Sequence, residues 1–400
     1  SELSRSAAMR DIGKGVVMLC AALSLFTLAS CGSKSEPGDA SEVPRTANAE
    51  AASVEEKPKS LQPRGLSGTW KEVGALPLAI ERPAALVLKD GRVFAYGSGE
   101  DSRGALFDPK TGLWTATAPS KRPRGESGLS LLGDGQVMVS GGVHVPKGHY
   151  VMRSSERYDP VRDTWTDSGS TGTQRRGHTQ HTLADGSIVV IGGVGGGFAR
   201  PTKQIDRYDP RSKTWRTLGA LQLGRSFHAS VVLGTGQLLV AGGQGAEEAL
   251  KTFERCDLKA GACRSMMRPS ARDRPTMSIL KTGDVLLVGG QSSRATSADA
   301  QLYDPSKGTF TPVGQPQARR NGHTATVLRD GRVLLVGGEK SAAKSSEVYD
   351  PEAKAWARGP ALRHPRHGHA TIMLRDGSVL LIGGVGPQGK PVLMSERLRL

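Results

Sequence analysis

The sequence predicts an all-β protein, a seven-bladed β-propeller with four antiparallel strands in each blade. Three observations support this fold class. A sequence pattern recurs every 44 to 51 residues through everything after Leu66. Each copy carries two turn signals between apolar runs, as two consecutive hairpins would. Glycine accounts for 52 of the 400 residues and aromatic residues for only 4%, a bias that a large array of short strands and tight turns produces.

The first half of each repeat reads as a hairpin whose second strand ends in a pair of glycines. The pairs begin at Gly141, Gly192, Gly242, Gly289, Gly337 and Gly383, and a degraded copy begins at Gly97. A turn dipeptide, Asp-Gly or Thr-Gly, precedes each pair by six or seven residues, from Asp90-Gly91 in the first repeat to Asp376-Gly377 in the last. Asp-Gly between two apolar runs favours a tight hairpin, because both central residues adopt positive φ. Each repeat therefore begins with two antiparallel strands.

The second half of each repeat reads as another hairpin, with one aromatic residue on each strand. The first aromatic residue is followed by Asp-Pro, and the second lies six residues past the aspartate. The pairs are Phe107 and Trp114, Tyr158 and Trp165, Tyr208 and Trp215, Tyr303 and Phe310, and Tyr349 and Trp356. Because Asp-Pro starts a turn, the two aromatic rings face each other across the hairpin. Two hairpins in each period make one four-stranded unit.

This order of features resembles the kelch repeat: an apolar strand, a double glycine, a tyrosine and then a tryptophan. The resemblance covers residues 67 to 400, with six clear copies. It implies a kelch-type propeller, distantly like the propeller domain of galactose oxidase. In such a fold the repeated glycines, tyrosines and tryptophans build the blades and pack them on one another, so we expect no catalytic role for them.

The two ends of the repeat array indicate how the ring closes. The array begins at Gly68-Thr69-Trp70, a fourth-strand tryptophan with no blade before it. It ends at Glu396-Arg397-Leu398, a third strand with no tryptophan after it. We therefore expect the N-terminal strand to join the C-terminal blade, which gives seven blades and leaves no open sheet edge.

The segment before the repeats predicts export and a lipid anchor. Residues 1–30 contain a short basic stretch and an apolar run of about 13 residues, too short to span a bilayer as a helix but typical of a signal peptide. The run ends in small residues before Cys31, which resembles a bacterial lipobox and implies lipidation of Cys31; the alternative is an ordinary signal peptide with a chance cysteine. Gly32 after the cysteine implies the outer membrane. Residues 31–66 are polar and predict a disordered tether, and residues 67–400 form the propeller.

One repeat replaces its aromatic pair by Cys256 and Cys263. The two cysteines occupy facing positions of a hairpin, in a compartment that permits oxidation. We expect a disulfide between them, because a zinc site would need two further ligands nearby.

The candidate binding residues lie at the starts of the first strands. An Arg-x-x-His pair recurs there as Arg175 and His178, Arg225 and His228, Arg320 and His323, and Arg366 and His369, while Arg124 and Arg272 are followed by Ser127 and Pro275. First strands are innermost in a propeller, so these side chains are expected at the mouth of the central channel. We call this side the near face; it also collects the loops after the glycine pairs.

Three interpretations of these pairs are open. Each Arg or His could satisfy backbone carbonyls or stack on the neighbouring blade, because buried polar groups require partners. The arginines, including Arg124, could instead form a cationic mouth for a carboxylate, a phosphate or an acidic peptide. A metal ring of the four histidines is the third possibility. Equivalent positions in different blades are usually too far apart to share one ion, so we expect no metal and no cofactor.

The sequence favours a binding module over an enzyme. A copper-radical oxidase site needs a cysteine cross-linked to a tyrosine, and the remaining cysteines occupy outer positions. The alternative function is a carbohydrate-active enzyme of the sialic-acid mutarotase or epimerase type, whose chemistry needs an acid/base pair. Few carboxylates are expected at the near face, namely Glu81, Glu126 and Asp273.

We therefore expect a monomeric, non-catalytic lipoprotein of the cell envelope, attached to the outer membrane by its lipid alone. Its partner would be a protein, a glycan or an anionic small molecule. The formal net charge of +16 favours anionic partners at long range. An envelope location removes most nucleic-acid partners, so none is expected.

Overall fold

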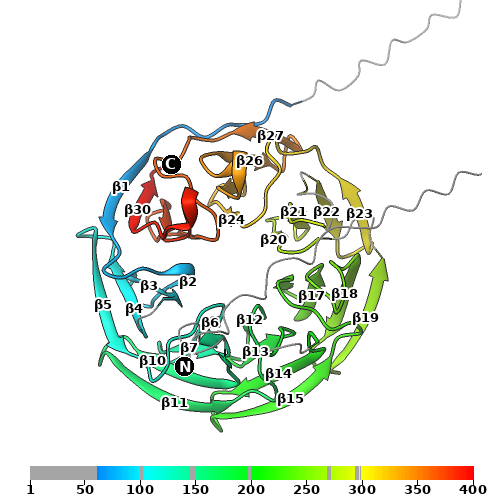
Figure 1. The fold of residues 1–400 in the computed structure, drawn as a ribbon. Helices are drawn as coiled ribbons and strands as arrows, with labels where there is room; N and C mark the ends of the chain where they lie inside the picture. Colours follow the sequence, from blue (N-terminus) through cyan, green and yellow to red (C-terminus); the bar gives the residue numbers. More distant parts are fainter. Residues whose placement is uncertain are drawn as a thin grey trace, which may run out of the picture. The chain divides into compact units, whose positions relative to one another are not determined.

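The computed structural model contains a closed ring of seven four-stranded antiparallel sheets (Figure 1). It describes residues 61–99, 102–144, 150–196, 200–267, 272–292, 297 and 299–400. The ring lies within a compact unit that runs from Pro58 to Leu400. The expected signal peptide, Cys31 and most of the expected tether lie outside the described residues. No helix in the described part of the chain has both the length and the apolar character that a membrane span requires.

The first three blades follow the expected hairpin order. Blade 1 consists of β2 (Glu81–Val87), β3 (Val93–Ser98), β4 (Arg103–Asp108) and β5 (Leu113–Pro119). Blade 2 consists of β6 (Gly128–Leu131), β7 (Val137–Ser140), β10 (Ser154–Asp159) and β11 (Thr164–Ser170), with a small ribbon of β8 (Val143–His144) and β9 (Tyr150–Val151) in its loop. Blade 3 consists of β12 (Thr179–Thr182), β13 (Ile188–Ile191), β14 (Gln204–Asp209) and β15 (Thr214–Ala220).

The next three blades repeat this order. Blade 4 consists of β16 (Ala229–Val232), β17 (Gln237–Ala241), β18 (Thr252–Asp257) and β19 (Ala262–Met267). Blade 5 consists of β20 (Thr276–Ile279), β21 (Val285–Val288), β22 (Ala300–Asp304) and β23 (Thr309–Pro312). Blade 6 consists of β24 (Thr324–Val327), β25 (Val333–Val336), β26 (Ser346–Asp350) and β27 (Ala355–Arg358), with a short 3₁₀ turn, η1 (Lys340–Ala342).

The seventh blade joins the two ends of the ring, as the sequence predicts. It contains β28 (Ala370–Met373), β29 (Val379–Ile382) and β30 (Met394–Leu398), with a 3₁₀ turn, η2 (Pro387–Gly389), between the last two. Its outer strand is β1 (Trp70–Ala75), which pairs antiparallel with β30 so that Trp70 faces Leu398. Figure 1 shows the blue N-terminal strand beside the red C-terminal one. Contacts also extend before residue 67, since Leu66 packs against the core of this region.

The core lies between neighbouring blades. The second strands of blades 2, 3, 5, 6 and 7 are buried along their whole length, and in blade 3 Val189 and Ile191 pack against Leu238 and Val240 of blade 4. The predicted aromatic pairs face each other, as Tyr208 and Trp215 do with ring centroids 5.2 Å apart. The first strands β2, β6, β12, β16, β20, β24 and β28 contact one another in sequence around the channel. These contacts gather the ends of the seven first strands around the channel, where their side chains can form one site.

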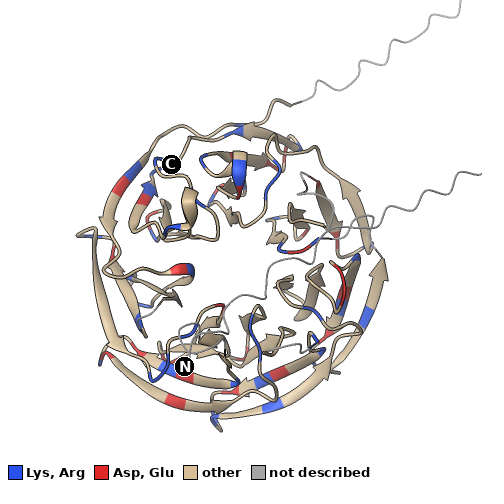
Figure 2. Ribbon diagram, in the orientation of Figure 1, with Lys and Arg blue, Asp and Glu red and all other residues tan. Residues whose placement is uncertain are grey.

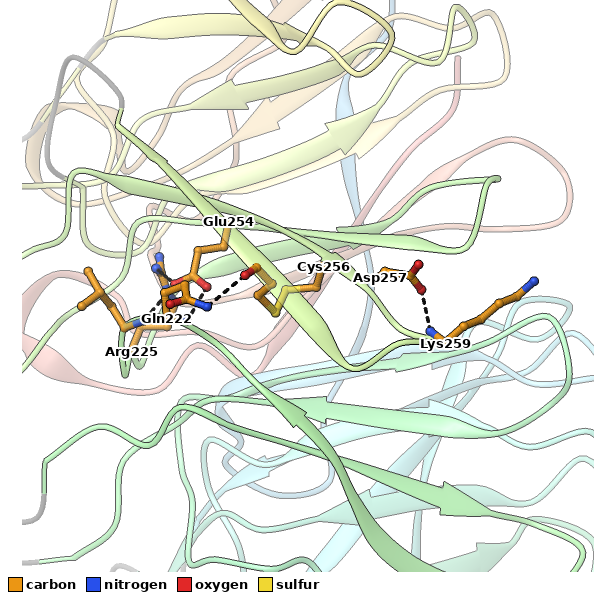
Figure 3. The surroundings of a disulfide bond; sticks show 8 residues. Gln222, Arg225, Glu254, Cys256, Asp257 and Lys259 are labelled. Atoms are coloured by element: carbon orange, nitrogen blue, oxygen red, sulfur yellow. Dashed lines mark hydrogen bonds and ion pairs between the residues drawn. A yellow bond between two sulfur atoms is a disulfide. The ribbon is translucent and has the colours of Figure 1, made fainter.

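The expected pairing of Cys256 with Cys263 is present. The two residues face each other across β18 and β19, and their sulfur atoms are 2.04 Å apart (Figure 3). Gln222 donates a hydrogen bond from its amide nitrogen to the carbonyl oxygen of Cys263 at 2.9 Å. The disulfide therefore takes the place of the aromatic pair that joins the outer hairpin in other blades.

Candidate functional site

The recurring arginines point into their own blades. Arg225 is fully buried, and its guanidinium donates to the carbonyl oxygens of Gly242 at 2.8 Å and Thr252 at 3.2 Å. It also forms an ion pair with Glu254 on the third strand of the same blade. Glu254 accepts two further hydrogen bonds, from the backbone N–H groups of Gln222 at 2.7 Å and Leu223 at 3.1 Å. The arginine thus joins the glycine pair, the third strand and the loop that enters the blade.

All six arginines repeat this arrangement and none is more than 2% exposed. Each donates to the carbonyl oxygen of the first glycine of its pair and to an acid on or next to the third strand. The ion pairs are Arg124 with Glu156, Arg175 with Asp206, Arg225 with Glu254, Arg272 with Asp299, Arg320 with Glu347, and Arg366 with Glu396. Their guanidinium groups are thus engaged inside the blades. This geometry favours the structural interpretation of the arginines over a cationic mouth.

The four histidines link neighbouring blades. Thr179, Thr276 and Thr324 of the preceding blades share hydrogen bonds of 3.0 Å with Nε2 of His228, His323 and His369. Ser140 lies 3.3 Å from Nε2 of His178 in the same way.

Burial and the nearby arginine keep these four imidazoles neutral. Burial, and then the charge of the nearby arginine, lowers the pKa of His178 and His323 to about 3. The pKa values of His228 and His369 lie well below the ordinary value for the same reasons. The histidines line the channel mouth, but they contribute no positive charge there at neutral pH.

The ligand atoms closest to a metal-binding arrangement lie elsewhere. In the described part of the chain, Glu254, Cys256 and Cys263 are the residues whose ligand atoms are near enough to share an ion. Glu254 is already paired with Arg225, and the two cysteines are bonded to each other. This cluster is therefore committed to the fold of blade 4.

The mouth of the channel is formed by residues that the sequence reasoning missed. Two positions after each recurring arginine, and at the equivalent place in blade 1, the backbone adopts the left-handed conformation with φ between 48° and 65°. These seven mouth residues are Arg82, Glu126, Gly177, Phe227, Arg274, Gly322 and Gly368. Glycine adopts this conformation without strain, whereas other residues pay about 1–2 kcal/mol. Blades 3, 6 and 7 use glycine, and blades 1, 2, 4 and 5 keep a strained side chain.

Backbone hydrogen bonds connect the mouth residues across blades. The N–H of Gly177 donates to the carbonyl oxygen of Glu126 at 3.2 Å, and that of Phe227 to Gly177 at 2.6 Å. The N–H of Arg274 donates to Phe227 at 3.0 Å, and that of Gly368 donates to Gly322 at 2.7 Å. These bonds fix the backbone at the mouth, and with it the points from which the side chains of the mouth residues project.

The mouth side chains form two contacting groups. Glu126 accepts from Arg82 at 2.7 Å and from Arg176 at 2.8 Å, and its side chain is only 9% exposed. The guanidinium of Arg274 lies 3.9 Å from the centre of the Phe227 ring, a cation–π contact. Arg176 approaches the same ring at 5.7 Å, which connects the two groups. Burial lowers the pKa of Arg274, although an arginine retains its charge throughout the physiological range.

Two adjoining cavities open at the mouth. The first, of about 300 Å³, is lined by Arg82, Glu126, Phe227 and Arg274 together with the four histidines. The second, of about 410 Å³, shares the two arginines and adds Gln291, Asn321, Glu339 and His367. Asn321 is only 2% exposed, and its Oδ1 has no hydrogen-bond partner in the described part of the chain. Burial also raises the pKa of Asp273, next to Arg274 in the chain. The second cavity is thus the more polar of the two.

A sequence signal for these residues does exist. Glycine stands two positions after the arginine in blades 3, 6 and 7, so this position is a glycine position of the repeat. Arg82, Glu126, Phe227 and Arg274 break that pattern. Of the near-face carboxylates expected from the sequence, Glu126 lies in the mouth. By contrast, basic and acidic residues are spread around the whole ring (Figure 2), so net charge alone does not locate a site.

Comparison with known proteins agrees with the repeat pattern. Residues 175–222 match the Kelch motif, and this segment contains the glycine pair and the aromatic pair of blade 3. The chain therefore carries a Kelch motif within a fold of the kelch type, a seven-bladed β-propeller. It is 30% identical to mouse Kelch-like protein 23 over 89 residues, which are 22% of this chain and 15% of that protein. It is 29% identical to the Caenorhabditis elegans spermatocyte protein spe-26 over 122 residues, which are 28% of this chain and 20% of that protein. The kelch propeller thus matches only a small part of each relative.

The propeller also resembles a solved fungal alcohol oxidase of the AA5 family, in complex with copper, with a TM-score of 0.69. The match covers 83% of this chain and 76% of the oxidase at 18% identity, so it shows a shared fold. The residues of this kelch propeller do not fit a copper-radical centre: Cys256 and Cys263 are bonded to each other, and Tyr158, Tyr208 and Tyr349 are buried within blades.

Proposed function

We propose that this kelch propeller is a binding module that holds a carboxylate-bearing segment of a partner protein in its near-face mouth. Kelch propellers commonly bind proteins, and that coarse expectation suits the fold. The observation that carries the proposal is the set of strained mouth residues. A backbone strain of about 1–2 kcal/mol at each non-glycine position persists only where the surrounding structure enforces it, and such strain clusters at functional sites.

The charge at the mouth supports an anionic ligand. Arg82 and Arg176 share one carboxylate, that of Glu126, and Arg274 lies 3.6 Å from that of Asp273. Three arginines at the mouth are thus paired with two carboxylates, while the four histidines stay neutral. The side chains of Arg82 and Arg274 are 46% and 33% exposed, so both can reach a ligand. Guanidinium groups bind carboxylates through two parallel hydrogen bonds, and Phe227 holds Arg274 in place for such a contact.

A second candidate function is a carbohydrate-active enzyme of the mutarotase or epimerase type. The more polar cavity favours it, because unpartnered acceptors such as Asn321 Oδ1 suit sugar hydroxyl groups. Asp273 lines neither cavity, but its carboxylate lies 3.6 Å from the cavity residue Arg274, and burial raises its pKa, as an acid/base role requires. A glycan or sugar acid is therefore the alternative ligand.

The cellular setting is part of the proposal. The lipobox-like sequence at Cys31 supports a lipid-anchored protein of the outer membrane, with the propeller as a monomer outside the cytoplasm. Replacement of Cys31 by serine should abolish incorporation of labelled fatty acid, and continued labelling of the Cys31→Ser protein would contradict this assignment.

The mouth can be tested with a labelled hexaglutamate peptide and its hexaglutamine analogue. The protein for this test is residues 58–400, the compact unit that contains all seven blades. Fluorescence anisotropy should show that it binds hexaglutamate but not hexaglutamine. The Arg82→Gly plus Arg274→Gly variant should weaken binding at least about tenfold, since each charge-assisted contact contributes roughly 1.5–3 kcal/mol. Glycine suits this backbone position, as blades 3, 6 and 7 show.

The matched control removes two exposed arginines from outer strands, Arg216→Gln plus Arg264→Gln. Equal loss of peptide affinity in both variants would contradict a site at the mouth. Binding of N-acetylneuraminate in place of hexaglutamate, with conversion between its anomers, would favour the enzyme.

A further inference from the structure

The opposite end of the channel carries an uneven ring of positive charge. On this far face the seven Asp-Gly and Thr-Gly turns join the first and second strands. The residue before each turn dipeptide is basic in four consecutive blades, 5, 6, 7 and 1, and small in blades 2, 3 and 4. We call Lys281, Arg329, Arg375 and Lys89 the cationic crescent; Gly133, Ala184 and Gly234 complete the ring.

The crescent residues are exposed and lean across the turn of the next blade. Arg329 donates to the carbonyl oxygen of Arg375, Arg375 to that of Lys89, and Lys89 to that of Gly133. The side chain of Lys281 lies over Gly331 in the same manner. These contacts use one donor nitrogen each of Arg329, Arg375 and Lys89, and they hold the four charges around one side of the opening.

Carboxylates near the crescent are mostly neutralised by other arginines. Asp90 pairs with Arg92 at 2.7 Å, and Asp330 pairs with Arg332 at 2.6 Å. Asp376 pairs with Arg397, which also donates to the carbonyl oxygen of Pro109 at 3.2 Å. The crescent cations have no ion-pair partner in the described part of the chain. Their four charges therefore remain available to an external anion.

The residues just before β1 contact the propeller on this same far face. Arg64 forms hydrogen bonds to Asp350, at the turn between β26 and β27, at distances of 2.8 to 3.1 Å. Arg332, just after the turn at Asp330-Gly331, donates to the carbonyl oxygens of Arg64 at 2.9 Å and Gly65 at 2.5 Å. Both turns belong to the far face. Arg64 and Gly65 are therefore held against the propeller on the face that carries the crescent.

We propose that the cationic crescent lies against an anionic bilayer and binds the phosphate groups of its lipids. This inference rests on the lipid anchor of the proposed function. Arg64 lies only 33 positions after Cys31, so the two residues are at most about 120 Å apart even if the chain between them is fully extended. Lysine and arginine near an anionic surface are attracted to it electrostatically. With the far face toward the membrane, the near-face mouth is directed away from it and open to a partner.

Vesicle co-sedimentation of residues 58–400 tests the surface without any lipid anchor. The probes are vesicles of phosphatidylcholine alone and of phosphatidylcholine with one-third phosphatidylglycerol. Binding should require phosphatidylglycerol and fall at least about tenfold in the variant Lys89→Gln, Lys281→Gln, Arg329→Gln, Arg375→Gln, since each cation near the surface contributes severalfold. The matched control removes four exposed cations from outer strands, Lys71→Gln, Arg216→Gln, Arg264→Gln and Arg358→Gln, and should bind as the unaltered protein does.

Several outcomes would overturn the proposal. Equal loss of vesicle binding in the crescent variant and the control would mean that net charge alone drives binding. Unaltered vesicle binding by the crescent variant would mean that the crescent takes no part in it. Displacement of the vesicles by millimolar glycerol phosphate would assign the crescent to a small anion. If the crescent variant loses hexaglutamate binding and the outer-strand control keeps it, the crescent would be a site for an acidic protein segment. Failure at the mouth is separate, because Arg82→Gly plus Arg274→Gly should still bind vesicles.

Discussion

Two sets of side chains, only two positions apart in the chain, have opposite characters in this propeller. The recurring arginines are the same residue in six blades, are fully buried and make the same contacts in each. The mouth residues vary from blade to blade, are partly exposed in blade 1 and carry backbone strain in four blades. A residue repeated blade after blade serves the fold that all blades share. A departure from the repeat, at a position where the backbone prefers glycine, is the better guide to a site that exists once.

The sharpest test of this contrast is the Arg225→Ala substitution. It should lower the free energy of unfolding by about 3–5 kcal/mol, because Glu254 would be left buried without its counter-charge. The midpoint of urea unfolding measures this change. The double substitution Arg225→Ala plus Glu254→Gln should recover part of the loss. A decrease below about 1 kcal/mol for Arg225→Ala would show that the buried pair is not a structural element.

Acidification tests whether the four buried histidines, like the recurring arginines, stabilise the fold. The pKa of His323 is lowered to about 3 in the folded protein, so the unfolded chain takes up a proton first as the pH falls below 6.5. Stability should therefore decrease from about pH 6.5 toward pH 3, by about 2 kcal/mol per buried histidine at pH 5. Urea unfolding of the unaltered protein and of His323→Gln at pH 7 and pH 5 measures this, and the variant should depend less on pH.

Peptide binding supplies the control for the histidines. If they stay neutral, hexaglutamate affinity should not rise between pH 7 and pH 6, where an ordinary imidazole gains charge. A rise over that interval, lost in His228→Gln, would place the histidines in the binding site instead.

The smallest effect is expected for Arg82→Gly alone. The substitution relieves a left-handed backbone with φ of 48°, and the lost contact with Glu126 is a half-exposed ion pair of little net value. The free energy of unfolding should stay unchanged or rise by up to about 1 kcal/mol, since glycine also gains freedom in the unfolded chain. Affinity for hexaglutamate should fall in the same protein. A clear loss of stability would mean that Arg82 supports the ring, and the distinction between the two sets would fail in blade 1.

The sequence was sufficient for the fold because each feature of it is local and repeated. The turn dipeptides and glycine pairs define the hairpins, and the unmatched strands at Trp70 and Leu398 define the closure. Cys256 and Cys263 could be paired because they occupy the place of an aromatic pair. The direction of a side chain cannot be predicted from the repeat in this way. The position of Arg225 at the start of a strand indicates which face of the propeller it is near, but not whether its guanidinium points toward the channel or into the blade. Phe227 and Arg274 went unnoticed because the residue that recurs at their position is glycine, in blades 3, 6 and 7, and they are departures from it.

The pairing of β1 with β30 has a consequence for biosynthesis. The outer strand of blade 7 is made near the start of the chain, and its partner is the last strand of the sequence. The final sheet therefore cannot form until β30 has been synthesised, and until then β1 lacks the strand with which it pairs. Contacts over such a separation close slowly, and unpaired strands are prone to aggregate. A chain shortened by a few residues at its C-terminal end should accumulate as an open ring, sensitive to proteases and dependent on chaperones, even though the other six blades are intact.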